Sequence, residues 1–238
     1  MFETVLLFVA AFIAAAISGA VGFGGALLLL PLLVFTVGVT HAVPLLTIAQ
    51  FIGNLSRAGF GFKQIRWKPV GLFLLGAVPF SILGAVSFVQ LPKELVMRLI
   101  GSAILIFILL KYFGLLKIKV SPVLLTGSGC LVGLLSGLVG SAGPLGAAIF
   151  LSLGLPPAGY ISSEAITALM MHGIKMLVYQ HFIPLNREFW SLAALMGIAM
   201  ILGTWSAKGF VERMPQKTFN RFVAVLLAAI AAYMLVHG

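Results

Sequence analysis

The sequence predicts an all-α integral membrane protein, a helical bundle built from two homologous repeats. Of its 238 residues, 61% are hydrophobic and 8% are charged, whereas about a quarter of the residues in a soluble domain carry a charge. Tracts longer than a bilayer span, such as residues 4–40 and 120–163, contain no charged residue. Because these tracts are continuously apolar and do not alternate every second residue, they favour helices over a membrane β-barrel.

A glycine-rich motif occurs twice, once in each half of the chain. It reads SGAVGFGG over residues 18–25 and SGLVGSAGP over residues 136–144. Landmarks beyond the motif keep the same order, since Trp67 in the first half corresponds to Trp190 in the second. Collinear landmarks indicate the duplication of one unit. We therefore expect two transmembrane repeats, residues 1–118 and 119–238.

Each repeat is expected to contain a glycine-broken helical tract, or a hairpin, followed by three transmembrane helices. As one straight helix, residues 4–40 would extend about 55 Å, far more than a hydrocarbon core of about 30 Å, so this tract must tilt, break or fold back. If it folds back at the glycines, the two repeats are inverted in the membrane; if it passes straight through, they are parallel. The expected helices lie at about 42–60, 69–90 and 94–116, and at about 161–181, 188–209 and 216–236.

The basic residues favour the inverted arrangement. The net charge of +10 resides mainly in short loops, where it sets membrane topology, so we expect no nucleic acid partner. Cytoplasmic loops are usually the basic ones, and the inverted arrangement puts both termini outside the cell. It places Lys63, Arg66, Lys68, Lys111, Lys117, Lys119, Lys208, Arg213 and Lys217 inside, against Lys93, Arg98 and Arg187 outside.

The two glycine motifs are expected to break the helix inside the membrane. Glycine permits an unwound backbone, and Pro144 suits the first turn of a new helix. The free N–H groups and the dipole of such a helix start attract an anion, and paired breaks are typical of a transporter's binding site. The plain alternative is that small residues only let helices pack closely. The candidate substrate-binding residues here are Ser18, Gly22, Phe23, Gly24 and Gly25, with Ser136, Gly140, Ser141 and Gly143.

Polar side chains on two expected helices complete the candidate site. Gln50, Asn54 and Arg57 lie four and three residues apart and so share one helical face. His172 and Lys175 stand where the second half repeats Asn54 and Arg57. Polar groups within the hydrocarbon region face a cavity or a partner by default, so we assign these five residues to substrate binding. Two alternatives stay open: the two cations snorkel to the interface, or the imidazole carries a proton coupled to transport.

Several function classes are disfavoured. No phosphate-binding loop of the Gly-x-x-x-x-Gly-Lys type is present, which argues against ATP hydrolysis. Cys130 is the single cysteine, so no thiolate metal cluster can form, and we expect no metal and no cofactor. We predict a secondary transporter of a small anion working by alternating access, and not an enzyme. A passive anion channel is the alternative, and an intramembrane hydrolase using Ser141 and His172 is a more remote one.

At the duplicated motif the chain resembles the sulfite exporter TauE/SafE family of bacterial and archaeal membrane transporters. The residues that carry the resemblance are Ser18-Gly19-x-x-Gly22-Phe23-Gly24-Gly25, the following Pro31, and the repeated Ser136-Gly137-x-x-Gly140. The second copy departs from the first in having Ala142 where Gly24 stands. The resemblance covers nearly the whole chain and implies a multi-pass protein of the prokaryotic inner membrane that exports sulfite or an organosulfonate. The partners are then the anion and the lipid bilayer, and a homo-oligomer stays an open alternative.

Overall fold

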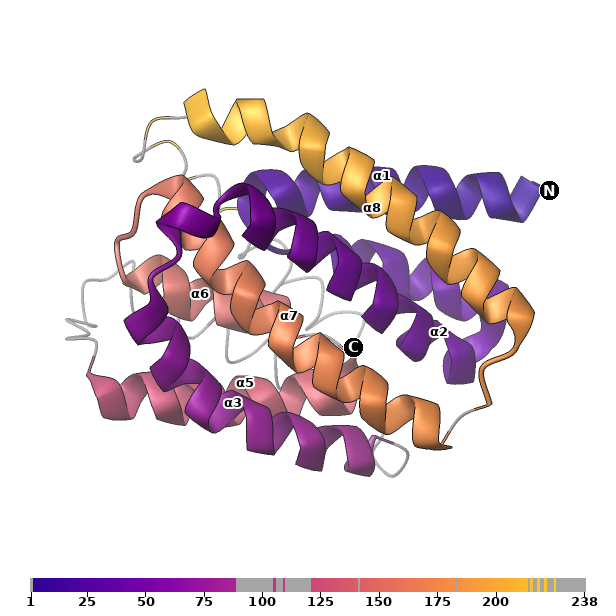
Figure 1. The fold of residues 1–238 in the computed structure, drawn as a ribbon, viewed down its shortest axis with the longest axis horizontal. Helices are drawn as coiled ribbons and strands as arrows, with labels where there is room; N and C mark the ends of the chain where they lie inside the picture. Colours follow the sequence, from indigo (N-terminus) through magenta and orange to yellow (C-terminus); the bar gives the residue numbers. More distant parts are fainter. Residues whose placement is uncertain are drawn as a thin grey trace.

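A computed structural model of the chain describes residues 2–88, 121–140, 142–182 and 184–213, with isolated positions at 105, 109, 215, 218, 221 and 225. Within these residues the fold is helical and contains no strand (Figure 1). The expected helices at about 94–116 and 216–236 lie outside the described residues, apart from those isolated positions. The elements are α1 (Phe2–Val21), α2 (Gly25–Phe60), the 3-10 turn η1 (Phe62–Gln64), α3 (Trp67–Ser87), α5 (Pro122–Val139), α6 (Gly143–Ser152), α7 (Pro157–Phe182) and α8 (Arg187–Arg213).

The described helices have the surface of a membrane protein. Three stretches are long and apolar enough to cross a bilayer, namely Thr4–Val21, Trp67–Ser87 and Arg187–Gly209. Large apolar side chains such as Phe35, Leu75 and Val123 are exposed on the outside of the bundle, while charged residues such as Arg57 are buried. This distribution is opposite to that of a soluble domain. The predicted class, an all-α integral membrane protein, is confirmed.

The first glycine tract folds back on itself. α1 ends at Val21 and α2 begins at Gly25, and between them Gly22 (φ 93°) and Gly24 (φ 100°) adopt the left-handed conformation that glycine alone takes readily. Core residues of the two helices then pack together, among them Ala11 of α1 and Leu29 of α2. Helix α2 turns a second time at Gly38 (φ 73°, ψ 160°). Of the two courses left open by the sequence, the hairpin is the one that this tract follows.

The second glycine tract breaks in the same way. α5 ends at Val139, Gly140 has a φ of 82°, and α6 begins at Gly143. Pro144 lies in the first turn of α6, as the sequence predicts, because a proline loses no hydrogen bond there. Helix α6 is only 10 residues long and leads through residues 153–156 into α7. The break therefore brings together the end of α5, the start of the short helix α6 and the long helix α7 that follows.

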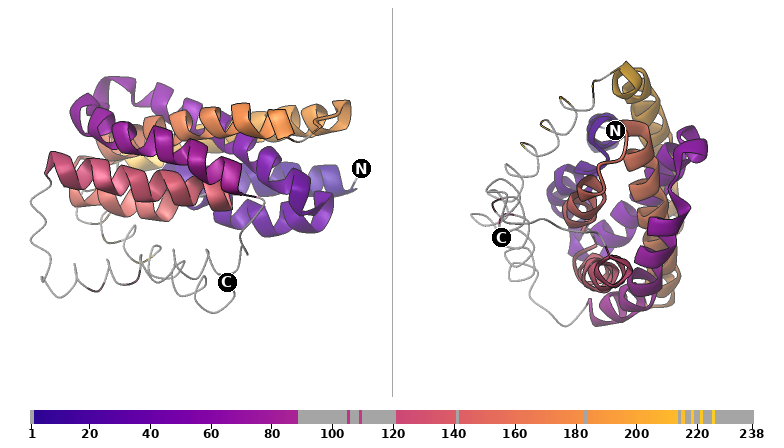
Figure 2. Two further views of the ribbon diagram at one scale, coloured as in Figure 1. Left: turned by 90° about the horizontal axis from the view of Figure 1, so that it is seen from below. Right: turned by 90° about the vertical axis from the view of Figure 1, so that its left-hand side faces the viewer.

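The helices form three packed pairs that contain one member from each half of the chain. α1 packs against α8 at one edge of the bundle, α3 packs against α5 at the opposite edge, and α2 and α7 pack together between them (Figures 1 and 2). The central pair runs antiparallel, since Ser162 near the start of α7 lies beside Gly61 at the end of α2, and Gly173 further along α7 lies beside Phe51. The core of the protein is thus an antiparallel pair of long helices.

Glycines allow the two outer pairs to approach backbone to backbone. A Cβ added at any of five glycines of the α3–α5 pair would overlap main-chain atoms of the partner helix. The same holds at Gly203 of α8, which faces the carbonyl oxygen of Phe12 in α1. Small residues at such spacing are the usual means of packing helices in lipid, where the hydrophobic effect does not drive association. The five glycines of the α3–α5 pair are Gly76, Gly84, Gly129, Gly133 and Gly137.

Candidate functional site at the two helix breaks

At the first break, Arg57 of α2 binds the end of α1. Its Nη1 donates a hydrogen bond to the carbonyl oxygen of Ser18 at 3.0 Å and another to that of Gly22. Its Nη2 donates to Oδ1 of Asn54, one turn earlier on α2. The last carbonyl groups of a helix lack partners within the helix and carry the negative end of its dipole. Arg57, which is 5% exposed, therefore neutralises the end of α1.

At the second break, Lys175 of α7 makes the equivalent contacts with the end of α5. Its Nζ donates to the carbonyl oxygen of Gly140 at 2.8 Å, to that of Ser136 at 3.2 Å, and to Oγ of Ser136 at 3.0 Å. Lys175 is fully buried. The two carbonyl acceptors precede each cation by 39 and 35 residues in both breaks. Snorkelling, which the sequence left open for both cations, does not occur.

The two breaks are joined across the central helix pair. Glu164 of α7 lies 3.9 Å from Arg57 of α2, and both side chains are buried. Tyr160 of α7 covers the first break, because a Cβ added at Gly22 would lie 2.7 Å from its ring. In the same manner, a Cβ added at Gly140 would lie 3.0 Å from Val43 of α2. Each break is thus covered by the long helix of the other half of the chain.

The centre of the bundle contains polar groups without partners. Gln50, Asn54 and His172 are all buried. In the part of the chain that the structure describes, Nε2 of Gln50 and Nδ1 of His172 have no hydrogen-bond partner. His172 lies one turn before Lys175 on α7. Buried polar atoms are almost always hydrogen-bonded, so these atoms could be satisfied by a polar ligand or by water.

The structure distributes the predicted residues over two kinds of position. The cations, the glycines of the motifs, Asn54 and Ser136 lie together at the breaks, whereas Ser18 donates its hydroxyl to the Ala14 carbonyl oxygen of its own helix at 2.9 Å. Phe23 is buried in the apolar core beside Val21 and Tyr160. Ser141 lies outside the described residues. The motif residues placed at the breaks are Gly22, Gly24, Gly25, Gly140 and Gly143.

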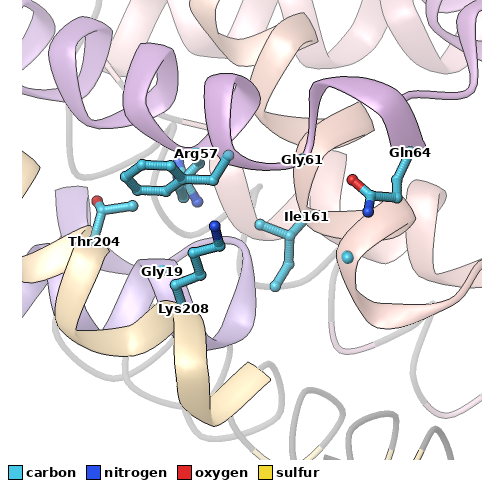
Figure 3. Close-up of a pocket in the computed structure, with 9 residues that line it drawn as sticks. Gly19, Arg57, Gly61, Gln64, Ile161, Thr204 and Lys208 are labelled. Carbon is cyan, nitrogen blue, oxygen red and sulfur yellow. The ribbon is translucent and has the colours of Figure 1, made fainter. Parts of the chain in front are cut away.

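A cavity lies beside the first break, toward the end of α2. The space open to the centre of a water-sized sphere is about 50 Å³. Figure 3 shows Lys208 reaching from α8 into this space, with Thr204 on the same helix and Arg57 on the opposite wall. The sequence interpretation missed Thr204 and Lys208, because nothing in the pattern of α8 indicates which of its faces meets α2. The lining residues are Gly19, Arg57, Phe60, Gly61, Gln64, Ala158, Ile161, Thr204 and Lys208.

Apolar helices surround the two breaks, and a buried cation lies at each break. These features define a polytopic membrane protein of the kind that moves solutes. The family model for the sulfite exporter TauE/SafE matches residues 7–234 of the 238. The chain belongs to this family, and the match includes both glycine motifs. Membership makes it a multi-pass membrane protein of a transporter family, with a small anion and the lipid bilayer as the implied partners. Comparisons with curated proteins and with solved structures found no significant match.

Proposed function

We propose that this protein is a secondary transporter that exports sulfite or a small organosulfonate across a prokaryotic inner membrane by alternating access. The observation that carries the proposal is the pair of breaks, each with a buried cation on its helix end. Among the described residues of the centre, Arg57 and Lys175 are two cations and Glu164 is the acid that contacts one of them. An excess of buried positive charge is costly unless a counter-charge is present, so this centre favours an anion.

The backbone at the breaks adds to this preference. Helices α2 and α6 both begin there, and among the described residues neither N-cap residue, Gly24 or Ala142, caps its helix with a side chain. The first N–H groups of a helix and the positive end of its dipole bind anions. Because the two cations cover the negative helix ends of α1 and α5, the positive helix starts dominate the potential. We place the anion between these helix starts and the unpartnered amide of Gln50 and imidazole of His172.

The arrangement of the two halves supports alternating access. Inverted repeats bring corresponding helices together antiparallel, and α2 and α7 run antiparallel with equivalent contacts on both breaks. Residues 1–118 and 119–238 are then the two repeats. Cavities lie toward both ends of the central pair: Gly61 lines one near the end of α2, and His41 and Asn186 line another near the start of α8. Between them lie the two breaks, and Tyr179 of α7 donates its hydroxyl to the Gly137 carbonyl oxygen at 3.0 Å.

The orientation of the protein in the membrane follows from the charge distribution. η1 and the start of α3, which adjoin the cavity near Gly61, carry Lys63, Arg66 and Lys68, and the end of α8 carries Lys208. Since cytoplasmic segments are usually the basic ones, the end of the bundle that carries this cavity faces the cytoplasm. Export is the direction that membership of the sulfite exporter family favours.

The test is flux of small anions in proteoliposomes. Sulfite, thiosulfate, sulfoacetate, sulfate and acetate are compared under a pH gradient and under a membrane potential, because His172 would allow proton coupling. We expect saturable flux of a sulfur anion that Asn54→Ala and His172→Ala abolish, while Ser191→Ala on the exposed face of α8 leaves it unchanged. Flux that rises linearly with concentration would favour a passive channel. No flux of any of these anions under either gradient would contradict the proposal.

A further inference from the structure

We infer that Glu164 is the proton-binding site of this transporter: its carboxylate takes up a proton when the anion enters the centre of the bundle, and the two cross together. The proton comes from water on the side of entry and returns to water on the side of release, so each cycle restores the carboxylate. The inference rests on the proposed function for the crossing, but proton uptake on anion binding is testable without transport.

Glu164 differs in its position from the other acidic residues of the chain. The sequence has five acidic residues, all of them glutamates. In the described helices, Glu3 and Glu188 lie in the first turns of α1 and α8, and Glu212 lies in the last turn of α8. Glu164 lies two turns inside α7 and is 3% exposed. An ionisable side chain buried among membrane helices is costly, and it marks an ion or proton pathway by default.

The carboxyl group of Glu164 lies close to both breaks. Its Oε2 is 3.9 Å from Nη1 of Arg57, the cation of the first break. A Cβ added at Gly146, in the first turn of α6, would lie 3.9 Å from its Oε1. The start of a helix favours a negative charge, and α6 begins at the second break. Glu164 is thus an anion of the protein itself in the region that we assign to the substrate.

The negative charge of Glu164 is incompletely compensated there. Nη1 of Arg57 donates its hydrogen bonds to the carbonyl oxygens of Ser18 and Gly22. Oε2 of Glu164 has no hydrogen-bond partner in the part of the chain that the structure describes. A buried carboxylate needs both a counter-charge and hydrogen bonds. The ion pair at 3.9 Å gives Oε2 only the first of these, so uptake of a proton removes a charge that is costly to hold.

A second anion in this region favours the protonated form of Glu164. Two like charges in one low-dielectric site repel each other, and protonation of one of them removes the repulsion. Once Glu164 is neutral, the positive charge of Arg57 acts on the substrate anion alone. By thermodynamic linkage, the anion promotes proton uptake and the proton promotes anion binding to the same extent.

Few other groups around Glu164 can titrate among the described residues. α2 contributes Arg57, whose guanidinium stays charged. Tyr160 lies one turn before Glu164 on α7, and a phenol keeps its proton near neutral pH. α5 and α6 contain no charged residue. His172, the other candidate for a proton, lies two turns further along α7.

The second half of the central pair has no acid in the equivalent position. Arg57 and Lys175 stand 118 residues apart and bind equivalent carbonyl oxygens, and the residue 118 positions before Glu164 is Leu46. Leu46 is fully buried in an apolar cluster. Lys175 therefore has no titrating partner in the matching position, and we expect one proton for each anion.

The experiment is isothermal titration calorimetry of the purified full-length protein with sulfite and with thiosulfate. Titrations at one pH in two buffers of different ionisation enthalpy give the number of protons taken up per anion. We expect wild-type protein to take up about one proton more than Glu164→Gln, whose neutral amide stands in for the protonated carboxyl. Because Glu164→Gln needs no proton, it should bind as tightly as wild-type protein at about pH 6 and at least fivefold more tightly at about pH 8.

Two further variants serve as controls. Glu188→Gln removes an exposed acid from α8 and should keep the wild-type proton uptake. Glu164→Asp keeps a carboxyl on a shorter side chain, so proton uptake should persist with its pH midpoint shifted. A purely structural role of Glu164 would make Glu164→Gln bind more weakly at every pH, whereas the inference predicts tighter binding at high pH.

Three results would overturn the inference: thiosulfate binding to wild-type protein without proton uptake, equal proton uptake in wild-type protein and Glu164→Gln, or an equal loss of uptake in Glu188→Gln. Equal uptake in Glu164→Gln would assign the proton to another group such as His172. If Glu164→Gln does not fold, an unshifted pH midpoint in Glu164→Asp overturns the inference in its place. Saturable anion flux without proton uptake would leave the proposed function standing and remove the inference alone, whereas wild-type protein that neither binds nor transports any of the anions would remove both.

Discussion

Arg57 and Lys175 each bind the carbonyl oxygens 39 and 35 residues before them, so one arrangement occurs twice in the bundle, 118 residues apart. In each case a cation on a long helix closes the end of the helix that precedes the break. Only Arg57 has an acid beside it in the described residues, Glu164 at 3.9 Å. The two breaks therefore share a backbone design and differ in their charge balance.

The Arg57–Glu164 pair should couple the two halves energetically. Removing one partner of a buried ion pair leaves the other charge uncompensated and costs about 3–5 kcal/mol. We expect Arg57→Gln to lower the free energy of unfolding by about this amount, and the double variant with Glu164→Gln to lose about 1 kcal/mol less than the sum of the single losses. Detergent-induced unfolding followed by circular dichroism measures all three. Arg57→Gln combined with Glu188→Gln, an exposed acid at the start of α8, should be additive.

Ser18 and Ser136 occupy the same place in the two motifs, but replacing each by alanine should affect stability to different extents. Oγ of Ser136 accepts a hydrogen bond from Lys175 at 3.0 Å, whereas Oγ of Ser18 donates to its own helix. Since a buried hydrogen bond to a charged group contributes about 1.5–3 kcal/mol, Ser136→Ala should destabilise by that amount. Ser18→Ala should cost less than about 1 kcal/mol. Equal losses of unfolding free energy in the two variants would show that the contact with Lys175 does not contribute to stability.

Gly22 should tolerate no side chain. Its φ of 93° is unfavourable for alanine, and a Cβ there would lie 2.7 Å from the Tyr160 ring. The strained backbone alone costs about 1–3 kcal/mol, so Gly22→Ala should both destabilise the protein and reduce flux. Gly59→Ala is the matched control, because Gly59 is in α2 with nothing within 4 Å of the added Cβ. A Gly22→Ala variant with wild-type flux would contradict the assignment of this break to the site.

The α3–α5 contact should depend on Gly133. A Cβ added there would lie 2.8 Å from Cα of Ala77 and overlap the carbonyl group of that residue, whereas one added at Gly127 of the same helix meets open space. Overpacking of this kind costs about 1–3 kcal/mol. Gly133→Ala should therefore lower the melting temperature and the yield of folded protein, and Gly127→Ala should lower neither. A neutral Gly133→Ala would mean that α3 and α5 are further apart than in this structure.

Local features of the fold could be predicted from the sequence, because they depend on neighbouring residues. Both breaks occur at glycines, whose lack of a side chain permits the left-handed backbone, and Pro144 marks the start of α6. The second turn at Gly38 was missed, since a lone glycine in an apolar tract rarely ends a helix. The helices expected at about 69–90 and 188–209 appear as α3 and α8 with nearly the same bounds.

The contacts between the halves could not be predicted in this way. That α8 packs on α1 and brings Lys208 and Thr204 to the end of α2 depends on which faces of distant helices meet. Apolar residues surround most membrane helices, so their periodicity is too weak to identify the buried face. The contact of Glu164 with Arg57 is of this kind, and it appears only when α2 and α7 are packed antiparallel.

The central claim is that a small anion crosses this protein by a carrier mechanism, and trans-acceleration tests it most directly. Proteoliposomes are loaded with unlabelled sulfite or with buffer, and the initial uptake of labelled sulfite is measured in both. A carrier that reorients faster when loaded should take up label several times faster into the sulfite-loaded vesicles, and His172→Ala should abolish the uptake in both. Uptake that is equal with and without internal sulfite, or that proceeds unchanged in His172→Ala, would contradict the account.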